Sequence, residues 1–177
     1  MKLYYYILGV VLLAFLLGVY YHLGGFRKIE VEKIENALPY EVKICGKHFD
    51  GNVQDEKWKG LFVEIRDMIV DGKLKAPVTV IYLKETPAGD NDKKIEAFIG
   101  SQAVPGTQPP DGLQEDSLSF KGVLRVRLTM HPVVMPSPQK VMKVISRYAA
   151  MNNLKPESLH IEKYYPDNTL AVEVPFK

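Results

Sequence analysis

Residues 122–130 read Gly-Val-Leu-Arg-Val-Arg-Leu-Thr-Met, and this segment begins the pattern from which we predict the fold. Its alternate positions carry leucine and valine on one side and mainly arginine on the other, a period of two that is typical of a strand with one buried face. Ser137 and Pro138 then supply an N-cap and a first-turn proline for a helix. Two further strands are predicted near 158–164 and 169–175. The second half of the chain is therefore expected to form strand–helix–strand–strand.

The first half of the chain repeats this order. A strand near 40–47 precedes a segment, 55–71, whose apolar residues have helical spacing. Strands near 78–85 and 94–101 follow, joined by a loop over 87–92 that is rich in Pro, Gly, Asp and Asn. Each half is thus predicted to contain the same four elements.

We predict an α+β fold made of two such repeats, residues 31–101 and 120–176. The segment 102–119 is rich in proline and glycine and is predicted to link them. The repeats are expected to join into one antiparallel sheet with both helices on one face. The opposite face would then remain free to form a ligand cleft where the two halves meet.

From Leu3 to Phe26 the sequence contains no Asp, Glu, Lys or Arg. A helix of this length reaches roughly 36 Å, enough to cross a hydrocarbon core of about 30 Å, and tyrosines lie at both of its ends. We predict a single-pass membrane anchor over residues 1–26 and a soluble domain over 27–177. The alternatives are a signal peptide, which has a shorter apolar core and a small-residue cleavage site, and a buried core helix, which is seldom apolar on every face.

Basic residues predict that the domain faces the cytoplasm. Arg27, Lys28 and Lys33 follow the apolar segment, whereas Lys2 alone precedes it, and the more basic flank tends to stay inside. Cys45 is the only cysteine and cannot form an intrachain disulfide, which agrees with a reducing compartment.

Charge and motifs argue against several classes of partner. The chain has 23 Lys and Arg against 21 Asp and Glu, so it lacks the basic excess expected of a nucleic-acid-binding domain. Its 4 histidines are scattered, without cysteine or carboxylate at the spacing of metal ligands. There is no Gly-rich phosphate loop after a strand. We therefore predict no nucleic-acid partner, no metal and no cofactor.

The strand 158–164, Ser-Leu-His-Ile-Glu-Lys-Tyr, supplies the candidate site. Its two apolar residues are expected to face the helices, which would place His160, Glu162 and Tyr164 on the free face. A carboxylate between a histidine and a tyrosine could hold a cation or transfer protons. The alternative is that Glu162 is a solvated strand residue paired with a Lys or Arg on a neighbouring strand.

Other polar and aromatic residues are weaker candidates. Glu173 is predicted to lie on the surface. Arg125 and Arg127 share one strand face and could line the cleft, although solvent exposure is the preferred interpretation. Trp58 and Phe62 are predicted to belong to the core rather than to a ligand pocket.

The repeated element order and the C-terminal strands resemble the GyrI-like small-molecule-binding domain. The last repeat of that family typically has a Glu-x-Tyr strand and then a hairpin ending in a hydrophobic–Pro pair. Glu162, Tyr164 and Val174-Pro175 match these features, and the resemblance covers about residues 31–176. It implies the same fold for the soluble part of this chain.

The resemblance also implies a role for Glu162, because in drug-sensing members a Glu at this position lies at the bottom of an aromatic-lined cleft that takes flat cations. A partly desolvated carboxylate beside aromatic rings favours such ligands. This reading predicts a lipophilic or cationic small molecule bound by Glu162, Tyr164 and His160. Other members hydrolyse strained toxins, in which case Glu162 would be the general base and Tyr164 would assist. A tethered protein-interaction domain with an unidentified partner is the third reading.

Two activities found in this family are not expected here. A membrane-anchored member acts in ER-phagy through a long disordered tail, whereas this chain ends at Lys177, directly after the last predicted strand. Drug-responsive regulators carry DNA-binding helices before the domain, and no such helices are predicted in this chain.

Overall fold

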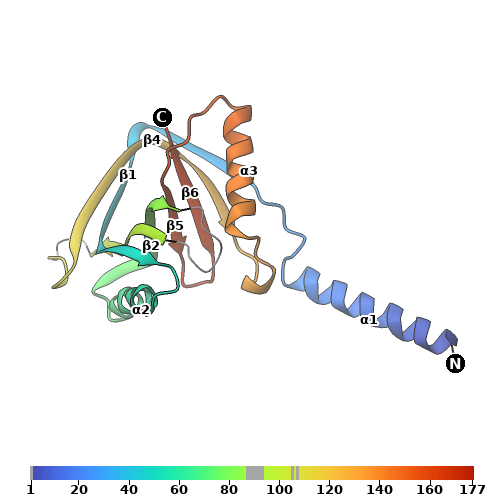
Figure 1. The fold of residues 1–177 in the computed structure, drawn as a ribbon. Helices are drawn as coiled ribbons and strands as arrows, with labels where there is room; N and C mark the ends of the chain where they lie inside the picture. Colours follow the sequence, from blue (N-terminus) through green and yellow to red (C-terminus); the bar gives the residue numbers. More distant parts are fainter. Residues whose placement is uncertain (1, 87–93, 105, 107) are drawn as a thin grey trace.

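The computed structural model describes residues 2–86, 94–104, 106 and 108–177 and has an α+β architecture. An N-terminal helix, α1 (Lys2–His22), projects away from a body of strands that carries two further helices on its outside (Figure 1). The loop predicted over 87–92 and residues 105 and 107 of the predicted linker lie outside the described residues.

Along the chain, the helices and strands of the body occur in the predicted order. They are β1 (Val31–Asn52), α2 (Glu56–Val70), β2 (Leu74–Glu85), β3 (Lys94–Ala103), β4 (Gln114–Leu128), a 3-10 turn η1 (Pro132–Val134), α3 (Pro138–Met151), β5 (His160–Tyr164) and β6 (Leu170–Phe176). β1 and β4 are longer than predicted. Because β4 begins at Gln114, the end of the predicted linker is a strand, paired with β1 from Gly46 back to Tyr40.

The sheet is closed, which corrects the prediction of an open sheet with a free face. In the part of the chain that the structure describes, six antiparallel strands follow the order β1-β3-β2-β5-β6-β4, and β1 also pairs with β4. β1 is long enough to pair with β4 through residues 31–46 and with β3 through residues 45–52. The face without helices is therefore the interior of a barrel.

Two glycines allow β1 to cross from one neighbour to the other. A Cβ atom on Gly46 would lie 2.1 Å from the carbonyl oxygen of Ile99, and one on Gly100 would lie 2.1 Å from that of Cys45. Gly46 and Gly100 are directly opposite each other in the β1–β3 register. Only glycine permits this backbone approach.

Capping residues set the helix ends much as the sequence predicts. The side chain of Asp55 accepts a hydrogen bond from the Lys57 amide at 2.9 Å at the start of α2, and Gly72, with φ +74°, follows its end. Ser137 caps α3 in the same way, accepting from the Lys140 amide at 3.4 Å.

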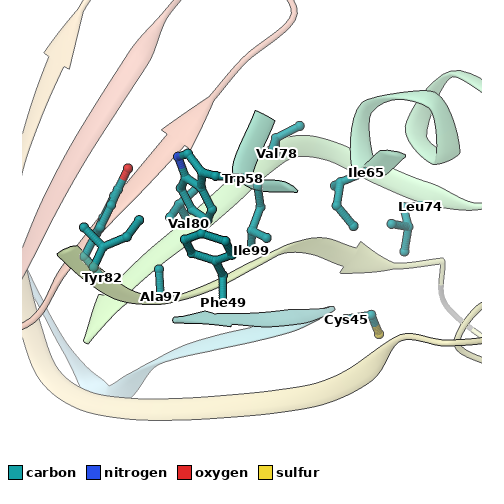
Figure 2. Packing of buried hydrophobic residues seen from close by; sticks show 11 residues of the cluster. Cys45, Phe49, Trp58, Ile65, Leu74, Val78, Val80, Tyr82, Ala97 and Ile99 are labelled. Carbon is teal, nitrogen blue, oxygen red and sulfur yellow. The ribbon is translucent and has the colours of Figure 1, made fainter. Parts of the chain in front are cut away.

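Buried apolar side chains lie on both sides of the barrel wall. The α2 cluster packs the strands against α2 (Figure 2) and contains Cys45, Phe49, Trp58, Ile65, Leu74, Val78, Val80, Tyr82, Ile95, Ala97 and Ile99. The inner cluster contains Val42, Ile44, Ile81, Phe98 and Ile161. A third cluster lies beneath α3 and includes Val141 and Ile145 with Leu124, Val126, Val172 and Val174. Adjacent strand residues such as Val80 and Ile81 thus face opposite sides of the wall.

The end of α1 is attached to the body. The carbonyl oxygen of Leu23 accepts a hydrogen bond from the His131 amide at 3.0 Å, and the Arg27 guanidinium donates to the Thr129 hydroxyl at 2.6 Å. The residues Tyr4–His22 form a helix long and apolar enough to cross a membrane, and all of them are exposed.

Candidate functional site

The direction of the β5 side chains is the reverse of the predicted one. Ile161 belongs to the inner cluster, whereas Tyr164 packs against the α2 cluster. His160, Glu162 and Tyr164 therefore lie on the helix-covered outer face. The prediction was wrong because it assigned the apolar side chains to the helices, while in this barrel Ile161 is needed to fill the interior.

Glu162 is enclosed on this outer face and is only 7% exposed. The hydroxyl of Tyr164 donates a hydrogen bond to one oxygen of its carboxylate, and Nε2 of His160 lies 3.8 Å from the other oxygen. Tyr82, opposite His160 on the neighbouring strand, stacks on the imidazole with a centroid distance of 4.6 Å. The structure therefore brings together the three predicted site residues and adds Tyr82.

Aromatic side chains of α2 cover Glu162 and the residues around it. Phe62 meets the ring of Tyr164 edge-on at a centroid distance of 5.4 Å, and Trp58 lies 6.3 Å from the ring of Tyr82. Figure 2 shows Trp58 and Tyr82 in the same cluster. Trp58 and Phe62 are thus core residues, as predicted, but they also enclose the candidate site.

Contacts with His160 and Tyr164 keep Glu162 ionised despite its burial. Burial by itself would raise the pKa of Glu162, but the nearby imidazole of His160 and the hydrogen bond from Tyr164 outweigh it and leave the pKa below its usual range. Burial, together with the charge of Glu162, raises the pKa of Tyr164 and of Tyr82, so both hydroxyls stay protonated. Among the described residues, the ion-pair contacts of Glu162 are limited to His160, with no Lys or Arg partner.

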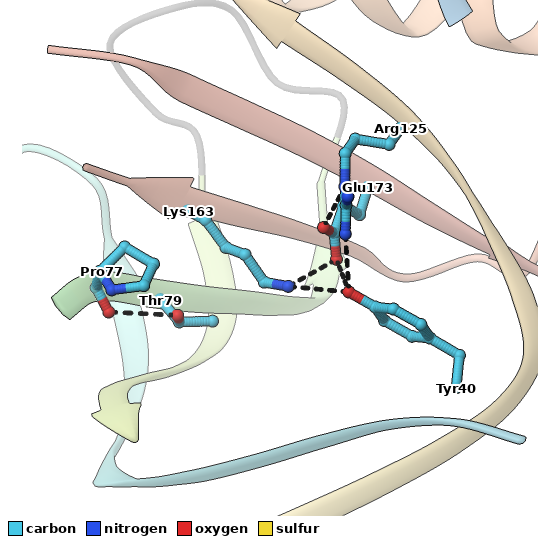
Figure 3. Close-up of polar contacts among 6 residues, drawn as sticks. All are labelled: Tyr40, Pro77, Thr79, Arg125, Lys163 and Glu173. Atoms are coloured by element: carbon cyan, nitrogen blue, oxygen red, sulfur yellow. Dashed lines mark hydrogen bonds and ion pairs between the residues drawn. The ribbon is translucent and has the colours of Figure 1, made fainter. Parts of the chain in front are cut away.

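A second polar cluster lies inside the barrel, on the face where His160, Glu162 and Tyr164 were expected (Figure 3). Glu173 on β6 is fully buried; Arg125 Nε on β4 lies 2.7 Å from one of its oxygens and Lys163 Nζ on β5 lies 2.9 Å from the other. The Tyr40 hydroxyl donates to Glu173 at 2.9 Å and accepts from Lys163 at 2.9 Å and from Arg125 at 3.1 Å. We call these four residues the interior cluster.

The interior cluster corrects two predictions. Glu173 was predicted to be a surface residue and Arg125 to be solvated, yet Glu173 is completely buried and Arg125 is paired with it, while Arg127 is exposed as predicted. Alternation did indicate that Glu173 faces away from its apolar neighbours Val172 and Val174. It could not indicate that barrel closure encloses the opposite face.

Both cations of the interior cluster remain charged. Burial by itself would lower the pKa of Arg125 and of Lys163, but the charge of Glu173 and the hydrogen bonds of the cluster raise both pKa values above their usual range. The cluster therefore contains two positive groups and one carboxylate around a shared tyrosine hydroxyl.

A cavity of about 640 Å³ lies apart from the polar group around Glu162 and from the interior cluster. It is lined by Lys43, Ile44, Cys45, Lys75, Gln102, Glu115, Asp116 and Ser117. Burial and the nearby carboxylate of Glu115 raise the pKa of the Cys45 thiol, which favours its protonated form. No group of three or more His, Cys, Asp or Glu side chains suited to a metal ion occurs within the described part of the chain.

Comparisons with known proteins identify the fold. No family model and no curated protein sequence matches this chain. Among solved structures, a hydrolase from Listeria innocua is 10% identical, with 85% of this chain and 92% of that chain covered and a TM-score of 0.53. An uncharacterized conserved protein from the same organism is 11% identical, with 85% and 93% covered and a TM-score of 0.53.

The C-terminal domain of EcmrR is similar to the same degree. It is 10% identical, with 86% of this chain and 98% of that domain covered and a TM-score of 0.53. This chain therefore shares the fold of these three proteins, whereas its membership of the GyrI-like family stays what the sequence resemblance implies. Identities this low establish the fold and do not transfer an activity.

Proposed function

We propose that this chain is a membrane-anchored module that binds amphipathic or cationic small molecules through Glu162. The observation that carries the proposal is a buried, ionised carboxylate that is surrounded by aromatic rings and has no Lys or Arg partner among the described residues. A buried charge normally has a charged partner. Glu162 has an ion-pair contact with His160 at 3.8 Å, and a cationic ligand would provide a permanently charged partner.

The surroundings of Glu162 suit a lipophilic cation. The faces of aromatic rings attract cations, by about 2 kcal/mol when the pair is desolvated. Tyr164 and His160 would contact the ligand, and Tyr82 would hold His160 in place by stacking. Because Trp58 and Phe62 cover the site, we infer that α2 must move outward to admit a ligand.

The order of the elements supports the two predicted repeats. β1-α2-β2-β3 and β4-α3-β5-β6 have the same sequence of elements, and they occupy equivalent halves of the strand order. We propose that residues 31–101 and 120–176 are repeats of one unit within a single domain, 27–177. That the domain binds no nucleic acid stays a prediction.

The role of the Glu162 carboxylate can be tested with a ligand that carries one positive charge on an apolar body. We expect 4-phenylbutylamine to raise the melting temperature of the full-length protein in non-ionic detergent and to bind at least tenfold more weakly to Glu162→Gln. Glu41→Gln removes an exposed carboxylate on β1 and should leave the affinity unchanged. Equal binding by parent and Glu162→Gln would exclude Glu162 from the site.

The pKa of Glu162 supports the hydrolase alternative less well. A general base is most effective when its pKa lies near the working pH, whereas the pKa of Glu162 is below its usual range. Turnover of a strained electrophile that is lost in Glu162→Gln would restore this alternative. A partner that co-purifies with parent and Glu162→Gln alike would instead favour an interaction domain.

Glu162 should also leave a signature in the pH dependence of stability. Its folded-state pKa is lowered from 4.5, so its contribution is complete above that pH and is lost as the pH falls through the folded-state value. We expect the difference in free energy of unfolding between parent and Glu162→Gln to be constant above pH 4.5 and to shrink below it. Urea unfolding at several pH values measures this difference, and one that grows on acidification would contradict the prediction.

We propose that α1 anchors the domain, which faces the cytoplasm. Arginine at the centre of a spanning helix costs about 2.5–3.5 kcal/mol per residue. The variant Leu12→Arg/Leu13→Arg should therefore be released from membranes by alkaline carbonate, whereas the parent and Leu38→Arg, a change at an exposed β1 residue, should be retained. A mature protein whose N-terminus begins after residue 22 would instead identify a signal peptide. Digestion of the domain by protease added outside intact cells would overturn the cytoplasmic orientation.

A further inference from the structure

The interior cluster has more positive than negative charge. Arg125 and Lys163 are both cations, and Glu173 is the carboxylate that both of them contact. Among the described residues, the other buried carboxylate is Glu162, which lies on the opposite side of the barrel wall. Glu32 is opposite Arg125 in the register of β1 on β4 but is exposed, so water hydrates it.

We propose that the interior cluster is a binding site for an anionic group, a carboxylate or a phosphate, on an amphipathic small molecule. The anion would contact Arg125 and Lys163 and complete the charge balance of the cluster. This site does not involve Glu162, and it takes ligands of the opposite charge.

Exposure of the side chains shows which groups a ligand would meet. The side chains of Arg125 and Lys163 are 16% and 15% exposed, whereas that of Glu173 is 0% exposed. The carboxylate is thus at the back of the cluster and the cations are at its accessible front. Charge-assisted hydrogen bonds from Arg and Lys are strong contacts for an incoming oxyanion.

The pairing of β1 with β4 has a bulge beside the interior cluster. The register of β1 on β4 shifts from Glu35 opposite Gly122 to Tyr40 opposite Phe120, so residues 36–39 face a single β4 residue. All four of these residues are exposed, and Leu38 is 77% exposed. Tyr40, a member of the cluster, directly follows this segment. Within this proposal, the bulge is the point at which the ligand reaches the cations, by displacing residues 36–39.

Apolar side chains at the edge of the barrel interior would contact the body of the ligand. They pack against the inner cluster but remain partly accessible, and they are Tyr40, Leu83, Leu118, Phe120 and Leu159. An apolar rim beside a cationic group is suited to a molecule with one charged end. This arrangement is why we infer an amphipathic anion rather than a simple inorganic one.

The test compares 4-phenylbutyrate, 4-phenylbutanol and 4-phenylbutylamine on the full-length protein in non-ionic detergent. We expect the carboxylate to bind the parent at least tenfold more tightly than the alcohol, and Lys163→Met to abolish that preference. Lys43→Met removes an exposed β1 lysine and should preserve it. Inorganic phosphate is expected to compete only weakly, because it lacks the apolar body.

Two further measurements keep the test decisive if Lys163→Met does not fold. In the parent, nuclear Overhauser effects should connect 4-phenylbutyrate with the rings of Tyr40 and Phe120. The carboxylate should also stabilise Glu173→Gln more than the parent, since it replaces the missing negative charge. Equal binding of carboxylate and alcohol, or a preference that survives in Lys163→Met, would overturn the proposal. Binding of 4-phenylbutylamine to the parent and to Glu162→Gln is measured separately. The proposed cation site at Glu162 and the proposed anion site in the interior cluster can therefore fail independently.

Discussion

Replacing Glu173 with glutamine is expected to lower the free energy of unfolding by about 3–5 kcal/mol, because it leaves buried charges without a partner. Glu173 contacts Lys163 at 2.9 Å and Arg125 at 2.7 Å inside the barrel. Glutamine keeps the shape of the side chain but removes the charge that balances both cations. Urea unfolding of parent and variant measures the loss.

A double variant separates charge from packing. Lys163→Met combined with Glu173→Gln removes one of the uncompensated cations. The double variant should therefore lose less free energy of unfolding than the two single variants lose in sum. Glu41→Gln, on an exposed carboxylate, should change stability by less than about 0.5 kcal/mol. A cost below about 1 kcal/mol for Glu173→Gln would contradict the assigned ion pairs.

Alanine at Gly46 is expected to destabilise the protein by about 3 kcal/mol, at the upper end of the range for overpacking. The added Cβ would lie 2.1 Å from the carbonyl oxygen of Ile99 and 2.7 Å from Cα of Gly100, and backbone atoms cannot rotate away. β1 would have to separate from β3 at the point where the barrel closes. Thermal unfolding followed by circular dichroism measures the effect.

Gly60 provides the matched control for this substitution. It lies within α2, and a Cβ there would have no neighbouring atom within 4 Å. Gly60→Ala should be neutral or should stabilise the helix by up to about 1 kcal/mol. Similar melting temperatures for Gly46→Ala and the parent would show that β1 and β3 do not approach each other so closely.

The two charged clusters lead to opposite expectations about the ligand. Glu162 and Lys163 are neighbours on β5 and point to opposite sides of the barrel wall, one toward the aromatic rings of α2 and the other toward Glu173. A ligand that contacts Glu162 is therefore expected to be a cation, whereas a ligand that contacts the next residue, Lys163, is expected to be an anion. Ligands that differ only in their charged end are the direct way to assign the site.

Local sequence patterns predicted the type and order of the elements, but not the full length of β1 and β4. The capping side chains of Asp55 and Ser137, and Gly72 after α2, set helix ends through contacts within a few residues, so their effect can be read along the chain. Alternation identified the strands near 40–47 and 122–130, because the two faces of each differ in polarity. The apolar character of Tyr4–His22 is likewise a property of composition alone.

Long-range pairing decided what alternation could not. Alternation separates Glu162 from Ile161 and Glu173 from Val172, but it does not say which face meets a helix and which face is enclosed. That assignment depends on β1 pairing with β3 and β4 at once, between residues distant in sequence. Barrel closure turned the expected open face into an interior and buried Glu173 beside Arg125 and Lys163. Segment by segment the chain specified its helices and strands, whereas the burial of its charges was a consequence of the closed sheet.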